Sequence, residues 1–143
     1  MITYRRLKKT DAVTSRAVHA LCAELSKDAG KNYSAVLLAR AVKEKNNFIC
    51  AAYERGVLVG MATLVHAVTL KGMCGRIEDV VVHETMRGKG VGRELMRRLM
   101  KEARRQKIKQ LELTSRPKRT AANKLYQSLG FTIRETNVYR MML

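Results

Sequence analysis

The chain has 143 residues, 46% of them apolar, which is enough for one hydrophobic core and excludes a disordered protein. Its formal net charge of +17, from 29 Lys and Arg against 12 Asp and Glu, favours anionic ligands such as phosphates, nucleotides or nucleic acid. No apolar run has the length of a membrane span, and the first residues lack the apolar stretch of a signal peptide. We therefore expect a cytoplasmic protein with no membrane partner.

The three cysteines, Cys22, Cys50 and Cys74, are too far apart and too few for a disulfide framework or a zinc site. The three histidines are scattered and show no metal-ligand spacing. The sequence therefore predicts reduced thiols and no metal.

Two helices are predicted after a first strand. Residues 2–7 alternate in polarity and predict a strand. Thr10 and Asp11 can cap a helix over about 11–26, and residues 28–32 are expected to break it. Ser34 can cap a second helix that continues to about residue 45.

A hairpin and a central strand are predicted next. Residues 47–70 contain two β-rich runs around a turn at 54–56, which is typical of a hairpin. Residues 71–75 predict a loop, and 76–83 predict a strand whose valine run suits burial on both faces.

The last third of the chain predicts two more helices and two more strand regions. An apolar ladder with four-residue spacing predicts a helix over about 91–106, and 108–115 predicts a strand. Residues 119–130 predict a short helix ended by Gly130, and 131–143 predict a last strand or strand pair.

The stretch "RGKGVG", residues 87–92, joins the valine strand to a helix and contains three glycines between basic residues. Such a loop is suited to an anion, because unpaired N–H groups and the helix dipole point at the ligand. Gly88, Gly90 and Gly92 let phosphate oxygens approach the backbone, and Arg87, Lys89 and Arg93 add full charges. The glycine spacing is that of neither a Walker loop nor a dinucleotide fingerprint.

"RGKGVG" resembles the R/Q-x-x-G-x-G/A signature of the GCN5-related N-acetyltransferases. The upstream "IEDVVV" and the downstream "AANKLYQSLGF" also resemble segments of that family, so the resemblance covers essentially the whole chain. It implies an α/β (α+β) fold in one domain over 1–143. In this fold the fourth and fifth strands of a mixed central sheet splay apart, and about four helices flank the sheet.

The resemblance also implies acetyl-coenzyme A as cosubstrate. Its pantetheine arm would bond the backbone of Val80, Val81 and Val82, like an added strand. Its pyrophosphate would meet N–H groups from Arg87 to Gly92, with Arg93 just inside the helix. The implied cofactor-binding residues are Val80, Val81, Val82, Arg87, Gly88, Lys89, Gly90, Val91, Gly92, Arg93, Asn123 and Tyr126.

Acetyl transfer to an amine needs a base, a donor to the thioester oxygen and an acid for the leaving thiolate. The resemblance assigns the acid to Tyr126, whose phenol has a pKa above that of a thiol. Glu78 is the preferred base or water-positioning residue, and Glu78 and Asp79 are the candidate substrate contacts. Because neighbouring strand residues point to opposite faces, at most one of the two is expected to face a given cleft.

The acceptor amine stays open between small molecules and peptides. "RIEDVVV", "RGKGVG" and the tail "NVYRMML" resemble the glucosamine 6-phosphate N-acetyltransferases, and the net charge would suit a phosphorylated acceptor. Its candidate phosphate contacts are Lys71, Arg76, Arg116 and Arg119. The same charge disfavours polyamine acceptors.

Two other functions stay open. Basic residues dominate 87–109, so one alternative is a non-catalytic protein that binds nucleic acid or the ribosome. The low aromatic content, 5%, argues against it because stacking platforms are missing. The other is a subunit of an acetyltransferase complex, or a homodimer, that pairs through the apolar tail.

Overall fold

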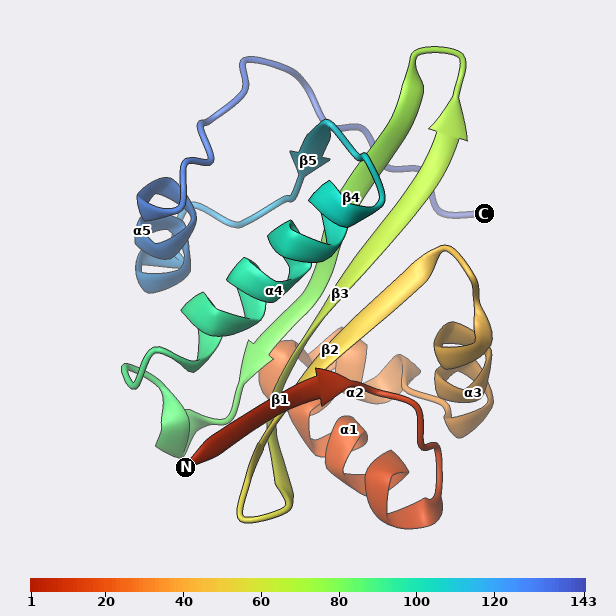
Figure 1. Cartoon of the computed structure of the whole chain (residues 1–143), viewed down its shortest axis with the longest axis vertical. Coiled ribbons are helices and arrows are strands. Elements are labelled where there is room, and N and C mark those ends of the chain that lie inside the picture. Colours follow the sequence, from red (N-terminus) through yellow and green to blue (C-terminus); the bar gives the residue numbers. More distant parts are fainter. The chain divides into compact units, whose positions relative to one another are not determined.

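The computed structural model describes residues 1–143, which form two compact units, Met1–Leu113 and Thr114–Leu143. The first unit contains a five-stranded sheet and four α-helices, and the second contains one helix (Figure 1). In chain order the elements are β1 (Ile2–Arg6), α1 (Ala12–Leu25), α2 (Lys27–Asn32), α3 (Ala35–Lys43), β2 (Asn47–Glu54), β3 (Val57–Thr69), β4 (Gly72–Val82), the 3-10 turn η1 (Glu84–Met86), α4 (Val91–Arg105), β5 (Gln110–Glu112) and α5 (Thr120–Ser128). That all 143 residues act as one domain stays a prediction.

The sheet has the order β1-β2-β3-β4-β5 and is antiparallel except for its last pair. β5 runs parallel to β4 and pairs with it only from Cys74 to Arg76. Beyond Arg76, β4 continues to Val82 without β5 beside it. The predicted mixed sheet with separating fourth and fifth strands is thereby confirmed.

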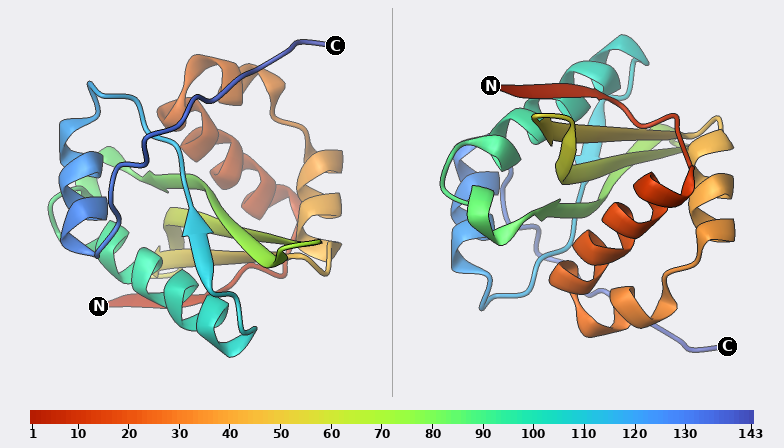
Figure 2. Two further views of the ribbon diagram at one scale, coloured as in Figure 1. Left: turned by 90° about the horizontal axis from the view of Figure 1, so that it is seen from above. Right: turned by 90° about the horizontal axis from the view of Figure 1, so that it is seen from below.

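Helices cover both faces of this sheet (Figure 2). On one face, α1 and α3 pack Leu21 and Leu38 against Ile49 and Met61 of the strands. On the other face α4 buries the predicted ladder, namely Val91, Leu95, Leu99 and Ala103, together with Met96. None of the helices has the combination of length and apolar character that crossing a bilayer demands.

The predicted helix starts are confirmed by their caps. The Asp11 carboxylate accepts a hydrogen bond from the Thr14 N–H at 2.9 Å, and the Ser34 hydroxyl accepts one from Leu37 at 3.2 Å. Each bond satisfies an N–H that a helix start otherwise leaves without a partner. The three cysteines are free thiols, as expected.

The first helix ends at Leu25, close to its predicted end, but the expectation that residues 28–32 form a non-helical break is wrong. They form α2, because the Ser26 hydroxyl caps it by accepting from the Ala29 N–H at 3.0 Å. Gly30 allows α2 to pack closely against α1, because a Cβ at this position would lie only 2.9 Å from the Cα of Ala23.

The predicted loop over 71–75 is also wrong, since β4 begins at Gly72 and pairs with β3 from there. Gly72 and Gly75 are required in β4 for two different reasons. Gly72 has φ +117° at the end of the hairpin turn, which favours glycine. At Gly75 a Cβ would lie 2.6 Å from the Leu111 side chain, so the bare backbone allows β5 to approach.

The two final strand predictions differ from the structure. Strand 108–115 shortens to Gln110–Glu112, the segment that pairs with β4. Residues 131–143 form no strand, so that prediction is wrong. An apolar alternating run needs a neighbouring strand for its backbone hydrogen bonds, and no strand pairs with these residues.

We expect Gly30→Ala to lower the free energy of unfolding by about 1–3 kcal/mol, because the new methyl group collides with the α1 backbone. At an uncrowded helical position the same change would raise it by about 1 kcal/mol. Urea unfolding measures the difference, with Lys31→Ala at an exposed site of the same helix as control. A more stable Gly30→Ala protein would contradict this packing.

Candidate active site

A β-bulge interrupts β4 at Asp79 and Val80. Met61 pairs with Val81 and Thr63 pairs with Glu78, so the single residue between Met61 and Thr63 faces two residues of β4. Asp79 takes up the extra length with φ +54°, a left-handed conformation that is unusual for a residue other than glycine. Such strain in a strand often marks a functional site.

The bulge lies within an open edge of β4. Pairing with β5 stops at Arg76, so the peptide groups of residues 77–82 face no strand on that side. Val81 is 5% exposed and packs in the core, while Val80 lies in the bulge. An exposed strand edge of this kind can bind an extended ligand through backbone hydrogen bonds.

The glycine loop follows this edge and opens α4. Gly88 and Gly90 have φ +75° and +80°, and a Cβ at either would meet nothing within 4 Å, so the space above them is open. Gly90 offers no side-chain cap, and the first bond of α4 runs from the Glu94 N–H to the Gly90 carbonyl at 3.1 Å. The N–H groups of Val91 and Gly92 therefore have no acceptor within the helix, which suits an anion.

The Arg87 side chain, which the sequence predicted to add a full charge at the loop, is held by two other groups. Its guanidinium donates to the Val82 carbonyl and to the Glu24 carboxylate of α1, both at 3.0 Å. Glu24 also accepts from the Glu84 N–H at 3.0 Å, and its other oxygen lies 3.5 Å from the His83 ring. One carboxylate thus ties α1 to the segment between β4 and the glycine loop.

On the α1 side of the sheet a cavity of about 290 Å³ contains the Asp79 carboxylate. Its lining is mostly apolar, contains no Lys or Arg, and consists of Leu7, Val18, Cys22, Ala29, Asn32, Tyr33, Ser34, Leu37, Leu38, Ala41, Ile49, Met61, Thr63 and Asp79. The Tyr33 hydroxyl is hydrogen-bonded to the Ser15 hydroxyl at 2.6 Å. The Tyr33 ring stacks on the His19 ring, with 4.8 Å between the ring centres. The cavity therefore has a fixed aromatic wall and one carboxylate.

The expectation that Glu78 and Asp79 face opposite sides is wrong, because the bulge changes the alternation. Thr63 lines the cavity and is the cross-strand partner of Glu78, and such partners share a face. Asp79 lines the same cavity. The two acidic residues therefore lie on the same side of the sheet.

The two carboxylates differ in their surroundings. Glu78 is bound by Arg76, with 3.0 Å from its Oε1 to both Nε and Nη2. Asp79 keeps contact with solvent, but the protein around it displaces water, and this burial raises the pKa of its carboxyl. The charge of Glu78 raises the pKa of Asp79 further, while a hydrogen bond from Thr63 acts in the opposite direction.

In the second unit, Tyr126 and Asn123 lie on α5. Burial raises the pKa of Tyr126, so its phenol keeps its proton at neutral pH. The Tyr126 and Phe131 rings pack edge to face, with 6.2 Å between their centres. The amide of Asn123 donates to the carbonyls of Arg116 and Pro117 at 3.0 and 3.3 Å, so it holds the loop before its own helix.

The strand with its bulge, the glycine loop and the helix match a known family. A sequence model of the acetyltransferase (GNAT) family matches residues 16–131. This chain belongs to the GNAT family. The resemblance stated from the sequence is thereby confirmed, and nothing in the match supports a binding-only nucleic-acid protein.

A GNAT relative, the L-methionine sulfoximine/L-methionine sulfone acetyltransferase of Salmonella typhimurium, is 34% identical over 86 residues. The match spans 59% of this chain and about half, 50%, of that relative's length. Two solved structures each match 99% of this chain. An acetyltransferase of Trypanosoma brucei matches over 100% of its own chain with TM-score 0.80 at 24% identity. A glucosamine-6-phosphate N-acetyltransferase of Arabidopsis thaliana matches over 98% with TM-score 0.77 at 16% identity, and these likenesses show the fold.

The residues present fit the pyrophosphate and pantetheine of a GNAT donor. The open space at Gly88 and Gly90 and the unpaired N–H groups of Val91 and Gly92 suit an anion. The edge at 77–82 has no β5 partner, although the Val82 carbonyl accepts from Arg87, and it suits the peptide-like pantetheine arm. No cluster of three or more His, Cys, Asp or Glu side chains is arranged to hold a metal ion.

Several residues of the candidate site were not predicted from the sequence. The wall of the cavity includes Tyr33, Thr63 and apolar residues. In the sequence these residues have the pattern of ordinary core positions, so nothing marked them as part of a site. Glu24 lies far from the loop in sequence, and nothing local connects it with Arg87.

We expect Asp79→Asn to raise the free energy of unfolding at pH 7. The folded-state pKa of Asp79 lies above its unfolded value, so the ionised carboxylate destabilises the folded protein and protonation relieves it. The advantage of the variant should therefore shrink as the pH falls toward the ordinary Asp value of 3.8. Urea unfolding at several pH values measures it, and a variant that is less stable at pH 7 would contradict the assignment.

Proposed function

We propose that this chain transfers the acetyl group of acetyl-coenzyme A to a primary amine, which binds in the cavity beside Asp79. The amine would attack the thioester directly while both substrates are bound. The observation that carries the proposal is the β4 bulge, which presents the Asp79 carboxylate to the cavity at the start of the open strand edge.

The donor would lie along β4 and the start of α4. Backbone groups of Val80, Val81 and Val82 would bond the pantetheine, and the N–H groups from Gly88 to Gly92 would bond the pyrophosphate. The Arg87 guanidinium is occupied by Glu24 and Val82, so its role there is to shape the loop. Lys89 and Arg93 are the basic residues proposed to add charge. The thioester supplies an activated acetyl carbonyl, and a backbone N–H near Val80 would stabilise the charge on its oxygen.

The acceptor we propose is a small amine with an apolar body and no phosphate. The cavity lining is mostly apolar and lacks cations, whereas a phosphorylated amino sugar would need them. Lys71 and Arg76 do not line the cavity, and Arg116 and Arg119 belong to the second unit. The Salmonella relative is named for two small amino-acid acceptors without phosphate, which supports the size of the proposed acceptor and its lack of a phosphate group.

Asp79 would accept the proton that the amine loses as its nitrogen bonds to the acetyl carbon. A carboxylate with a raised pKa is a stronger base than ordinary Asp, and while ionised it also attracts an incoming ammonium group. Glu78, held by Arg76, would act by raising the pKa of Asp79. The C–S bond breaks in the same reaction, and the leaving sulfur takes up a proton, a role that the resemblance to the family assigns to Tyr126.

The donor site is tested by Gly90→Glu. We expect the affinity of this variant for acetyl-coenzyme A to fall about ten-fold or more. The new carboxylate would repel the pyrophosphate, and a residue with a side chain is strained at the φ of +80° that Gly90 adopts. Calorimetric titration measures the affinity. Gly56→Glu is the matched control: its φ of +81° is also left-handed and a Cβ meets nothing within 4 Å, but it lies in the β2–β3 turn. Equal losses in both variants, or no binding to the unmodified protein, would refute the donor site.

The base is tested by comparing Asp79→Asn with Glu78→Gln. We expect Asp79→Asn to lower kcat about 10²–10⁴-fold, the usual contribution of a general base. Glu78→Gln removes a like charge and so lowers the pKa of Asp79, which should move the acid limb of kcat/KM to lower pH. Steady-state rates with an acceptor such as methionine sulfone measure both effects. If Glu78→Gln abolished activity while Asp79→Asn changed kcat little, Glu78 rather than Asp79 would be the base.

A further inference from the structure

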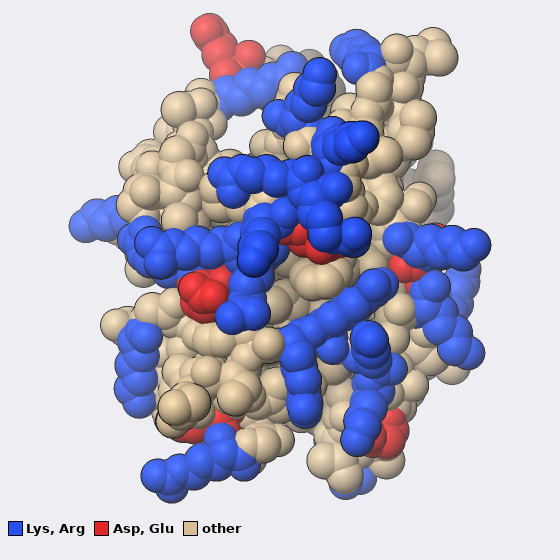
Figure 3. Space-filling view, viewed as in Figure 1, with Lys and Arg blue, Asp and Glu red and all other residues tan.

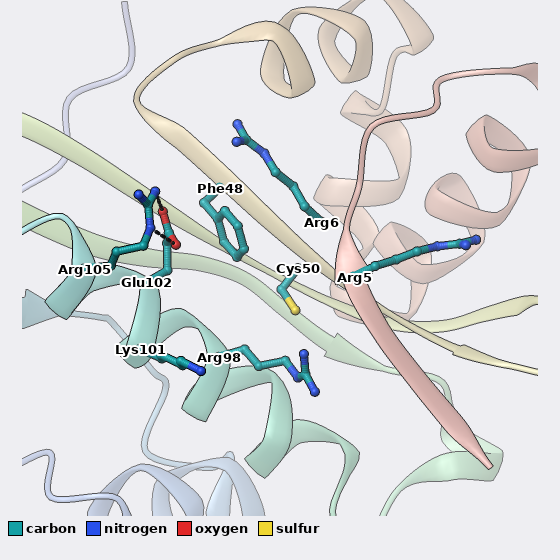
Figure 4. Close-up of a pocket in the computed structure, with 8 residues that line it drawn as sticks. All are labelled: Arg5, Arg6, Phe48, Cys50, Arg98, Lys101, Glu102 and Arg105. Carbon is teal, nitrogen blue, oxygen red and sulfur yellow. Dashed lines mark hydrogen bonds and ion pairs between the residues drawn. The ribbon is translucent and has the colours of Figure 1, made fainter.

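A second cavity, of about 240 Å³, lies on the opposite face of the sheet from Asp79, between α4 and the first two strands. It is lined by Arg5, Arg6, Phe48, Cys50, Arg98, Lys101, Glu102 and Arg105. Figure 4 shows Phe48 and Cys50 in its centre, with Arg6 on one side and Arg98, Lys101 and Arg105 of α4 on the others, while Arg5 points away. The cavity thus has an uncharged floor and a cationic rim.

Two rim arginines are held in place by neighbouring groups. The Arg6 guanidinium lies 5.5 Å from the centre of the Phe48 ring and donates to the Asn47 carbonyl at 3.2 Å. The Arg98 guanidinium lies 4.8 Å from the centre of the Tyr4 ring. Guanidinium groups that are already ordered lose less entropy when a ligand binds.

The acids near the rim are already bound. Glu102 accepts from Arg105 and from the Gln106 amide, the latter at 2.6 Å. Glu94 accepts from the Arg98 Nε at 2.8 Å, which leaves the other guanidinium nitrogens of Arg98 for a further acceptor. Lys101 is exposed and makes no ion pair. Arg6 and Lys101 therefore lie in no ion pair, while Arg98 keeps N–H donors for a ligand although Glu94 already pairs with its charge.

The floor carries no charge. Phe48 is half-buried and Cys50 is 1% exposed. Burial raises the pKa of the Cys50 thiol to about 11, so it stays protonated at neutral pH and does not repel an anion. Lys and Arg side chains also crowd over the surrounding face of α4 and β1, which strengthens the attraction for anions (Figure 3).

We propose that this cavity is a binding site for the phosphate groups of a small oligophosphate ligand, either free or carried by a nucleotide. Guanidinium forks match phosphate oxygens in geometry and charge, and the concave apolar floor limits the ligand to a compact one. The site is separate from the proposed donor loop, because its α4 residues lie from the middle of that helix onward and its other residues belong to β1 and β2.

The test titrates tripolyphosphate and, separately, ATP into the whole protein saturated with acetyl-coenzyme A, which fills the donor loop. We expect both probes to bind, and the double variant Arg98→Gln, Lys101→Gln to bind them about ten-fold or more weakly. Tighter binding of ATP than of tripolyphosphate would identify the nucleotide as the ligand class, and equal binding would identify the oligophosphate. Affinity for acetyl-coenzyme A should stay unchanged in the variant.

The matched control is Arg97→Gln, Arg104→Gln, which removes the same charge from exposed positions of α4 outside the cavity. The single variant Lys101→Gln changes an exposed residue without an ion pair, so it should fold normally. It should also weaken binding, which separates loss of the site from loss of folding. Equal weakening in the two double variants would show attraction to the whole basic face, as for nucleic acid, and would overturn the proposal. So would the failure of both probes to bind the unmodified protein.

Discussion

The left-handed backbone at Asp79 determines how the proposed site is arranged. One extra residue in β4 brings two consecutive acids to the same side of the sheet. The bulge also lies in the part of β4 that has no β5 beside it and can present its peptide groups to a ligand. A regular strand would turn one of the two acids to the opposite face. The conformational strain at one residue is therefore the structural basis for placing a base beside a strand-like binding edge.

The glycine loop depends on a second constraint, which comes from α1. Glu24 binds Arg87 and the Glu84 N–H, so the helix that borders the acceptor cavity also holds the loop proposed for the donor. The two proposed substrate sites are thus joined through one carboxylate. An arginine that appears in the sequence as a phosphate ligand is here part of the support of the loop, with its guanidinium also on the Val82 carbonyl.

Periodicity and capping predicted most of the fold, because α4 and the caps at Asp11 and Ser34 depend on residues close in sequence. Two of the errors arose where a glycine is needed for tertiary packing. Gly30 and Gly75 read as helix breaker and loop, yet each is needed where two elements approach closely. The family motifs identified the loop and the valine strand, whereas the bulge and the cavity wall depend on pairing between distant segments. The cationic cavity likewise combines β1, β2 and α4, which no local pattern connects.

An NMR titration of the ¹⁵N-labelled protein with acetyl-coenzyme A tests the central claim most directly, because it reports the backbone amides one by one. The account predicts that the shifts concentrate at Val80–Val82 and Gly88–Gly92, while Arg6, Phe48 and Arg98 change little. Shifts confined to the cationic cavity, with the β4 edge and the glycine loop unchanged, would contradict the assignment of the donor site.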